Sequence, residues 1–397
     1  MSGKKKILMV MPVMKGGGAE RVASLLLNEF SRNGYNCEFL LTSSKKEDVI
    51  NRDLSPDIPI SSVFSDKKNG MFFKVAELLA SLLCKPFEML GINVPAYFAF
   101  LSFFFQYHNE IKALREKLKT EPDTTVISFL QPSVPMTLIA AKRLPNKVVI
   151  SERGDPKRLL KKRYGYNFIK KYYQRANAVV YQTNDAMAAY PDNISAKGTV
   201  IFNPINNKLP EPYFGERERY ITTFCRVSRQ KNLPMLVQAF ANFHKEFSDY
   251  RLKIIGEPQN DDDRASLNET KALADKLGVT DYIDFEPFSS KVHDLIIRDA
   301  MYVNSSDYEG MSNAMLEAMA IGMPVVCTDC PIGGANAVIE NGINGMLAKV
   351  GDPEDFANAI IKVLSDKKLA ESLSLNAAKI RDELSLENIS KKWMELF

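Results

Sequence analysis

The chain has little of what marks secreted or disulfide-stabilised proteins. Its 397 residues include five cysteines, an odd number without scaffold-like spacing, which is typical of a reducing compartment. The lysine-rich start, residues 1–6, leads into a strand-like segment without the apolar stretch and cleavage site of a secretory signal. These absences predict a cytoplasmic protein.

The net charge of +4 is small, but the charged residues are distributed unequally between the two halves of the chain. Residues 1–205 contain 30 Lys and Arg against 18 Asp and Glu, a net charge of +12, whereas residues 206–397 contain 22 against 30, a net charge of −8. We therefore expect the first half to meet an anionic partner, such as a membrane surface or a phosphorylated acceptor. The aromatic and glycine motif of RNA-binding domains is absent, so no nucleic-acid partner is expected.

Short apolar runs alternate with helical patterns in both halves, which predicts an α/β protein with two doubly wound, Rossmann-like domains. The Asn- and Pro-rich stretch 203–212 marks the linker. We place the first domain at residues 1–203 and the second at residues 204–385. The expected strands are residues 7–12, 37–42, 125–130, 148–151, 178–182 and 199–202 in the first domain, and 221–225, 251–256, 282–286, 301–304 and 324–328 in the second.

The stretch 309–317 constrains function more than any other. It has the pattern of a turn followed by a helix, with Ser312 as the N-cap, Glu309 before the helix and Glu317 inside it. The amides at the start of such a helix bind phosphate. At about 1.5 Å per residue, Glu317 lies roughly 7 Å further along, about the reach from a diphosphate to the ribose of one nucleotide. The predicted donor-binding residues here are Glu309, Gly310, Met311, Ser312, Asn313 and Glu317.

A second group of charged residues follows the expected strand 221–225. Ligands of α/β sheets bind beyond the carboxyl ends of the strands, where Arg226 and Lys231 lie. The planar fork of Arg226 and the point charge of Lys231 can together neutralise a diphosphate. Arg229 adds a third cation, which either contributes or is simply solvated.

These motifs resemble the signature of the retaining family 4 glycosyltransferases, which have the GT-B fold. The resemblance rests on the two glutamates at positions 309 and 317, on Arg226 and Lys231, and on the N-terminal glycine loop. It implies that Arg226 and Lys231 grip the diphosphate of a nucleotide sugar, that Glu309 faces the sugar, and that Glu317 accepts from the ribose. It also implies that the C-terminal helix, residues 386–397 with the single tryptophan Trp393, returns to the first domain; packing within the second domain is the alternative.

Five residues of the first half are candidate contacts to the donor or the acceptor. Gly17 and Gly18 lie in a glycine turn between a strand and a helix, where a backbone can approach a ligand closely, so we expect them to contact the donor phosphates. Glu20 follows and is a candidate acceptor contact. Where many family members carry a histidine, this chain has Glu152 and Arg153, which become candidates for contacting the sugar; a surface ion pair is the alternative.

Two motifs that suggest metal or redox chemistry have simpler explanations. The run Asp261, Asp262 and Asp263 contains a DxD pattern, but three acids in a loop before a helix more often cap the helix or meet solvent. Cys327 and Cys330 form a CxxC pair without a second Cys or His pair, which favours a structural role. We therefore predict an enzyme without a metal or other cofactor.

Two segments of the first half suggest a membrane. Residues 94–107 contain seven aromatics and no charge, and residues 156–175 contain eight Lys or Arg and no acid. They suggest a face that docks on an anionic membrane; a buried helix and a solvated basic helix are the alternatives. Localisation on the inner face of the cell membrane is thus expected.

The sequence as a whole predicts a glycosyltransferase that moves a hexose or N-acetylhexosamine from an NDP-sugar, with UDP as the favoured nucleotide, to a glycolipid or lipid-linked oligosaccharide. Two other classes stay open: an epimerase or phosphorylase of the same fold, and a non-catalytic module that binds nucleotide sugars. Measuring donor hydrolysis with and without glycolipid acceptors separates them.

Overall fold

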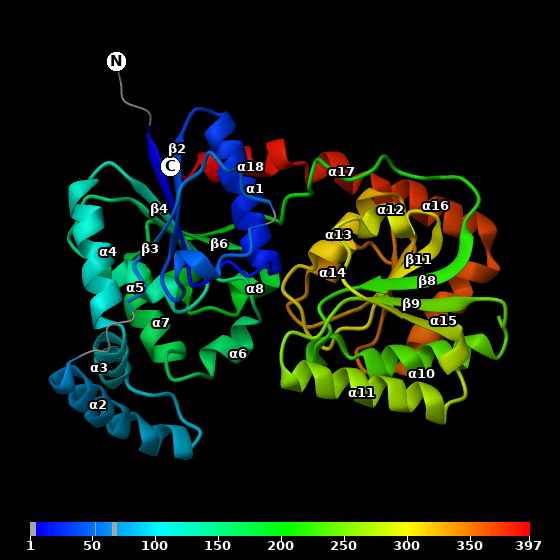
Figure 1. The fold of residues 1–397 in the computed structure, drawn as a ribbon, viewed down its shortest axis with the longest axis horizontal. Helices are drawn as coiled ribbons and strands as arrows, with labels where there is room; N and C mark the ends of the chain where they lie inside the picture. Colours follow the sequence, from blue (N-terminus) through cyan, green and yellow to red (C-terminus); the bar gives the residue numbers. More distant parts are fainter. Residues whose placement is uncertain (1–4, 52, 66–69) are drawn as a thin grey trace. The chain divides into compact units, whose positions relative to one another are not determined.

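The computed structural model describes residues 5–51, 53–65 and 70–397. Its backbone contacts divide the chain into two compact units, which we describe separately (Figure 1). Unit 1 comprises Met1–Pro204 and Leu386–Phe397, and unit 2 comprises Ile205–Ser385. Residues 1–4 of the lysine-rich start lie outside the described residues.

Unit 1 is built on a parallel sheet with strand order β3-β2-β1-β4-β5-β6-β7. β1 lies inside the sheet and is buried from Ile7 to Met11, as expected of a strand covered on both faces. The strands are Lys6–Met11 (β1), Asn36–Leu41 (β2), Ile60–Ser62 (β3), Thr125–Phe129 (β4), Val148–Ser151 (β5), Ala178–Tyr181 (β6) and Gly198–Val200 (β7). The helices are Gly18–Arg32 (α1), Met71–Met89 (α2), Ala96–Gln106 (α3), His108–Thr120 (α4), Ser133–Ala140 (α5), Pro156–Leu160 (α6), Tyr166–Tyr172 (α7), Asn184–Ala188 (α8), Asp192–Ser195 (α9) and Leu386–Met394 (α18).

Unit 2 repeats this architecture with a parallel sheet of order β10-β9-β8-β11-β12-β13. The strands are Glu218–Phe224 (β8), Arg251–Ile255 (β9), Ile283–Glu286 (β10), Asp299–Asn304 (β11), Val325–Thr328 (β12) and Met346–Ala348 (β13). The helices are Leu233–His244 (α10), Asp261–Lys276 (α11), Val292–Ile296 (α12), Asn313–Ala320 (α13), Gly334–Val338 (α14), Pro353–Ser365 (α15), Lys367–Ala378 (α16) and Ile380–Glu383 (α17).

The predicted fold class is confirmed, because both units are doubly wound parallel sheets flanked by helices. Each expected strand is present, with ends shifted by three residues or fewer. The two strands that the sequence pattern missed, β3 and β13, are three residues long and lie at sheet edges. Three residues are too few to show the alternation or the long apolar run that marks a strand.

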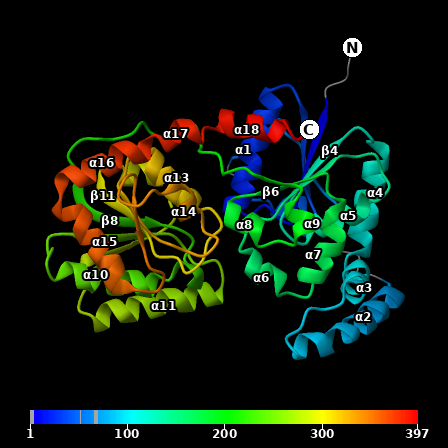
Figure 2. The same ribbon diagram turned by 180° about the vertical axis from the view of Figure 1, so that it is seen from behind.

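The C-terminal helix α18 lies beside α1 in both views of the chain (Figures 1 and 2). Trp393 is buried and its ring centroid lies 5.6 Å from that of Phe129 at the end of β4. Phe397 extends the contact, with its ring centroid 5.0 Å from Phe30 of α1. These aromatic contacts hold the end of the chain on the first unit.

The aromatic segment 94–107 contains α3, which packs on the core of unit 1 with most of its aromatic side chains half-buried. Phe103 is fully buried, and Phe100 stacks on Tyr172 of α7 at 5.1 Å between ring centroids. Tyr97 alone among the aromatics of the helix is mostly exposed. None of the helices in the described part of the chain has the length and apolar content needed to cross a bilayer.

Candidate active site

The loop from β11 to α13 holds Glu309 at the start of a capped helix. The Ser312 hydroxyl accepts from the backbone N–H of Met315 at 3.4 Å, which makes Ser312 the N-cap as predicted. The carbonyl of Gly310 accepts from the backbone N–H of Gly334 at 2.5 Å. The loop before α13 is therefore fixed at both ends, and the positive end of the α13 dipole lies next to Glu309.

A second loop follows β8 and carries Lys231. Residues Arg229–Lys231 form a short 3-10 turn, and Asn232 then adopts a left-handed conformation with φ 44°. The Asn232 side chain accepts from the backbone N–H of Met235 at 3.2 Å and caps α10. Asparagine tolerates the left-handed region better than most residues, so this residue can end the turn and start the helix together.

Several hydrogen bonds join the two loops. The backbone N–H of Asp307 donates to the carbonyl of Gln230 at 2.9 Å, and the Ser305 hydroxyl donates to the carbonyl of Lys231 at 2.8 Å. The amide of Asn232 donates to the Asp307 carboxylate at 2.7 Å. Because β8 and β11 are neighbours in the sheet, the loops that follow them lie side by side.

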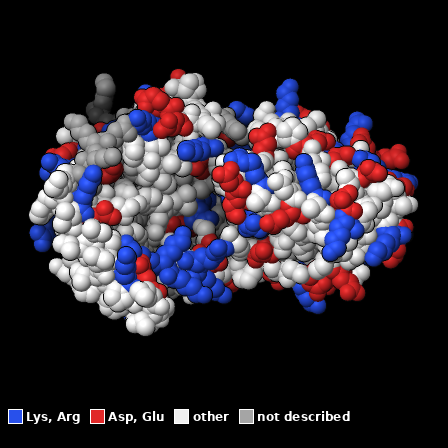
Figure 3. Space-filling model, turned by 60° about the horizontal axis from the view of Figure 1, so that its bottom comes forward, with Lys and Arg blue, Asp and Glu red and all other residues white. Residues whose placement is uncertain are grey.

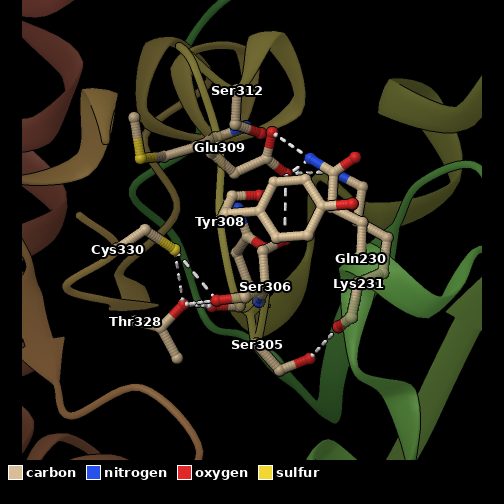
Figure 4. A network of polar contacts seen from close by, with 11 residues as sticks. Gln230, Lys231, Ser305, Ser306, Tyr308, Glu309, Ser312, Thr328 and Cys330 are labelled. Atoms are coloured by element: carbon tan, nitrogen blue, oxygen red, sulfur yellow. Dashed lines mark hydrogen bonds and ion pairs between the residues drawn. The ribbon is translucent and has the colours of Figure 1, made fainter. Parts of the chain in front are cut away.

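The joined loops bring Lys231 and Glu309 into an ion pair, although they are 78 residues apart in sequence. The other Glu309 contacts are hydrogen bonds from the Ser306 hydroxyl at 2.9 Å and from the Gln230 amide at 3.1 Å (Figure 4). Burial disfavours the charged form of Lys231, but the carboxylate of Glu309 outweighs this effect and the pKa of Lys231 is raised. The ammonium group of Lys231 is thus kept charged despite its burial, and the ion pair holds it next to Glu309.

Arg226 and Arg229 differ sharply in their surroundings. Arg226 is exposed and forms no ion pair with the residues that the structure describes. Its positive charge partly opposes the rise that Glu309 causes in the pKa of Lys231. Arg229 is also exposed, but it pairs with Asp262 at 2.8 Å and with Glu269 at 2.9 Å. The structure therefore places Arg229 in an ion-pair network with α11, and leaves Arg226 as the cation next to Lys231.

Ser306 is itself held by the last residue of β12 and by a residue that follows this strand. The Thr328 hydroxyl donates to the Ser306 carbonyl at 2.6 Å, and the Cys330 thiol approaches the same carbonyl at 2.9 Å (Figure 4). Burial raises the pKa of Cys330 to about 11, which keeps the thiol protonated near neutral pH. Cys330 therefore serves as a hydrogen-bonding residue beneath the Glu309 loop.

Glu317 is buried in α13, with one carboxylate oxygen 2.9 Å from Nε2 of His293 on α12. The His293 ring also packs edge-on against Phe224 of β8, at 5.5 Å between ring centroids. Sequence reasoning missed His293, together with Gln230 and Ser306. The chain has three histidines, but nothing in the spacing around His293 connects it to a residue 24 positions away.

The glycine loop of unit 1 is held by Glu20. The Glu20 carboxylate accepts from the backbone N–H of Lys15 at 2.6 Å and of Gly17 at 2.8 Å. Gly17 is the N-cap of α1, and Gly18 is its first residue. A Cβ on Gly17 would lie 3.3 Å from the Glu20 carboxylate, so the glycine permits this close approach. The Glu20 carboxylate faces the loop's own amides.

Glu152 and Arg153 have separate partners and do not form the surface ion pair that was the alternative. The Tyr173 hydroxyl donates to Glu152 at 2.6 Å, and burial raises the pKa of Glu152 to about 7. The Arg153 guanidinium lies 4.7 Å from the ring centre of Phe129 and donates to the side chain of Asn203. Burial lowers the pKa of Arg153 to about 9.

The part of the chain that contains Arg226, Lys231, Glu309 and Glu317 matches a known protein family. Residues 206–380 match the family described as Glycosyl transferases group 1. The match covers nearly all of unit 2. The chain is also 22% identical, over 98% of its own length and 99% of the relative's, to an uncharacterized glycosyltransferase of Haemophilus influenzae. It is 25% identical, over 60% of its length and 35% of the relative's, to a poly(glycerol-phosphate) alpha-glucosyltransferase of Bacillus subtilis.

Solved structures of similar fold cover both units. Anabaena HepE, solved with UDP and glucose, has a TM-score of 0.74 at 17% identity and covers 98% of each chain. A TarM variant of S. aureus, solved with UDP and alpha-GlcNAc-glycerol, has a TM-score of 0.70 at 14% identity and covers 99% of each chain. The chain therefore has the fold of the GT-B glycosyltransferases, and its family match supports glycosyltransferase activity.

The three aspartates of the DxD pattern form the first turn of α11, directly after its N-cap Asn260. Asp263 is buried and accepts from the backbone N–H of Gln259 at 3.1 Å, whereas Asp261 and Asp262 are exposed, as expected for the run. Asp261 pairs with Arg264 and Asp262 with Arg229. Within the described residues, no group of three or more His, Cys, Asp or Glu is arranged to hold a metal ion.

Proposed function

We propose that this chain is a retaining glycosyltransferase. It moves a hexose or N-acetylhexosamine from a UDP-sugar to a hydroxyl of a membrane-associated glycolipid or lipid-linked oligosaccharide. The observation that carries the proposal is the joining of the β8 and β11 loops, which sets Lys231 and Glu309 together at the start of α13. The choice of UDP is supported by HepE and TarM, whose structures were solved with UDP.

The proposed reaction requires this site to stabilise a departing diphosphate. Negative charge grows on the diphosphate as the glycosidic bond breaks, and preorganised cations and amides stabilise it without rearranging. Arg226, Lys231 and the backbone amides of Gly310, Met311, Ser312 and Asn313 are the proposed groups. Lys231 is suited to this role because Glu309 keeps it charged despite burial.

The two glutamates have different proposed roles. Glu309 faces the transferred sugar and is fixed by Gln230 and Ser306, so it can hold the sugar in one orientation. Glu317 lies further along α13 and accepts from the ribose hydroxyls, with His293 orienting its carboxylate. The leaving phosphate takes the proton of the attacking hydroxyl, so the proposal assigns no protein base.

The candidate residues of unit 1 are proposed as contacts to the reacting molecules. Gly17 and Gly18 contact the donor. Glu20 holds their loop by accepting hydrogen bonds from two of its backbone amides. Glu152 and Arg153 are the proposed sugar or acceptor contacts. The raised pKa of Glu152 means that about half of its carboxyl groups carry a proton near neutral pH, so it can donate to a hydroxyl as well as accept.

The proposal is tested by incubating the chain with UDP-glucose and UDP-N-acetylglucosamine, with and without glycolipid acceptors. A transferase releases UDP faster when an acceptor is present and yields a glycosylated lipid with the configuration of the donor. An epimerase changes the sugar without an acceptor, a phosphorylase needs inorganic phosphate, and a binding module releases no UDP. Any of these last results would replace the proposal.

Removing divalent metal ions is expected to leave activity unchanged. The proposed site neutralises the diphosphate with Arg226, Lys231 and helix amides. The three aspartates are engaged elsewhere, Asp261 and Asp262 in ion pairs and Asp263 in a hydrogen bond from the backbone of Gln259. The measurement is UDP release after treatment with EDTA, with and without added Mg²⁺ or Mn²⁺. Loss of activity on chelation and its return with Mg²⁺ or Mn²⁺ would identify a metal requirement and contradict the prediction.

Reversing the charge of four lysines is expected to impair transfer to a lipid-embedded acceptor much more than transfer to a soluble analogue. Each basic residue near an anionic membrane contributes about 1 kcal/mol to binding, and salt screens this attraction beyond roughly 10 Å at 0.1 M. The variant changes four exposed residues between α6 and the end of α7 to Glu: Lys161, Lys162, Lys170 and Lys171.

A matched control changes the same number of exposed lysines of unit 2 to Glu: Lys245, Lys276, Lys362 and Lys368. It alters the net charge equally but leaves the basic segment, residues 156–175, unchanged. Equal rates of the first variant on both acceptors, or equal losses in the two variants on the lipid acceptor, would mean that the basic segment is simply solvated.

A further inference from the structure

Helix α2 presents a continuous apolar face to solvent. Eight of its side chains are between 46% and 86% exposed, which is unusual for large apolar residues in one helix: Met71, Phe72, Val75, Leu78, Leu79, Leu82, Leu83 and Met89. At about 100° per residue, these eight fall within an arc of roughly 140° around the helix axis. Lys74 and Lys85, both exposed, lie along one edge of this arc. We call this surface the α2 face.

The opposite side of α2 is already packed. Ala80 and Cys84 are buried, and Phe73 stacks on His108 at 4.1 Å between ring centroids. α2 contacts α3 along this side. The helix is thus fixed to unit 1 by its inner side, and the α2 face contributes nothing to the core of the described chain. Removing this apolar area from water would lower the free energy, and this requires a surface beyond the described residues to cover it.

The α2 face adjoins the basic segment of α6 and α7. Arg163, between these two helices, pairs with Glu88 of α2 at 2.5 Å and donates to Ser81 at 3.1 Å. Asn167 of α7 donates to the carbonyl of Val94, just after α2, at 3.1 Å. Figure 3 shows the result as a broad white area at the lower left beside a dense blue group. An apolar surface and a cationic surface therefore lie next to each other on unit 1.

We propose that the α2 face is a membrane-binding surface that inserts into the outer part of an anionic lipid bilayer, while the basic segment contacts the lipid headgroups. The inference deepens the proposed function, because it rests on a membrane-associated acceptor and names the helix that brings the enzyme to it. Interfacial helices lie in the plane of the membrane with an apolar face buried about 5–10 Å. α2 meets this description, whereas the aromatic residues of α3 are used in the core.

The charges favour a bilayer over a second copy of this chain. A symmetric dimer places the same patch of both copies face to face, which would bring two basic segments and two pairs of flanking lysines together. Like charges that face each other oppose such an association. An anionic bilayer supplies both an apolar interior for the α2 face and negative headgroups for the lysines beside it.

Trp fluorescence tests the insertion directly. The single native tryptophan, Trp393, is buried, so an added tryptophan reports its own surroundings. With phosphatidylcholine and phosphatidylglycerol vesicles, the Leu78→Trp variant is expected to shift to shorter emission wavelength and to be quenched by lipids brominated on the acyl chain. The matched control is Leu375→Trp, at a similarly exposed leucine of α16 in unit 2. Absence of quenching at position 78, or equal quenching at both positions, would overturn the proposal.

A second variant measures how much the α2 face contributes to binding. Replacing Met71, Leu78 and Leu82 with Ser removes only exposed side chains, and is expected to lower vesicle partitioning at least about tenfold. The control replaces three exposed apolar residues of unit 2 with Ser: Leu295, Ile343 and Leu375. Unchanged partitioning of the α2 variant, together with conversion of a dimer to a monomer in sedimentation velocity, would assign the face to a second copy and reject the bilayer.

These measurements use vesicles alone, without a sugar nucleotide, and so do not depend on catalysis. Vesicle binding in a chain that releases no UDP would reject the proposed function and leave the membrane surface standing. UDP release and transfer to a soluble acceptor, without vesicle binding, would reject the membrane surface and leave the transferase standing.

Discussion

Replacing Glu309 with Ala is expected to abolish sugar transfer, a loss of about 10³ or more in kcat, while largely sparing the affinity for UDP. The proposed role of Glu309 is to hold the transferred sugar, so its loss removes an interaction that UDP does not make. The substitution also frees the ammonium group of Lys231 from its ion pair, which leaves a cation for the diphosphate. The measurements are kcat from UDP release and the Kd of UDP from calorimetry.

Two further variants distinguish the effect of the Glu309 charge from the effect of a hydrogen bond to its carboxylate. Glu309→Gln keeps the size of the side chain but removes its charge, and is expected to be nearly as inactive as Glu309→Ala. Ser306→Ala removes one hydrogen bond to the carboxylate and is expected to lower kcat by only about fivefold, the loss of roughly 1 kcal/mol. Near-normal turnover of Glu309→Ala would show that the site has been assigned to the wrong residue.

Replacing Arg226 or Lys231 with Ala is expected to lower the rate of transfer by about 10² or more in each case, the effect of losing one preorganised donor. The charge that these residues stabilise grows as the diphosphate departs, so the larger effect should fall on kcat. Lys231→Ala carries an additional cost, since it leaves the Glu309 carboxylate without its ion pair. Steady-state kinetics with a soluble acceptor give kcat and KM separately.

Arg229 provides the matched control for these two substitutions. It lies in the same loop and is a cation of the same kind, but it is exposed and already paired with Asp262 and Glu269. Arg229→Ala is expected to change kcat by less than about threefold, because exposed ion pairs contribute at most about 1 kcal/mol. If Arg226→Ala and Lys231→Ala raised KM without changing kcat, the two residues would bind substrate and transition state equally.

Local patterns determined much of the architecture. The central strand β1 is apolar from Ile7 to Met11, because strands covered on both faces contain few polar residues, and it was predicted to within one residue at each end. Ser312 marked the start of α13, because N-capping depends on a single side chain that accepts from the first amides of the helix. The spacing of Glu309 and Glu317 along this turn and helix followed from the same local geometry.

Tertiary structure decided which residues meet. Lys231 and Glu309 come together because β8 and β11 are adjacent in the sheet, and strand order cannot be read from either strand alone. The same applies to His293 beside Glu317, and to Glu152 and Arg153, which are consecutive in sequence yet have different partners. The apolar helices α2 and α3 differ in what they expose: Phe103 of α3 is fully buried, whereas Met71 and Phe72 of α2 are mostly exposed. Composition measures how apolar a helix is, but only packing determines which of its faces the rest of the chain covers.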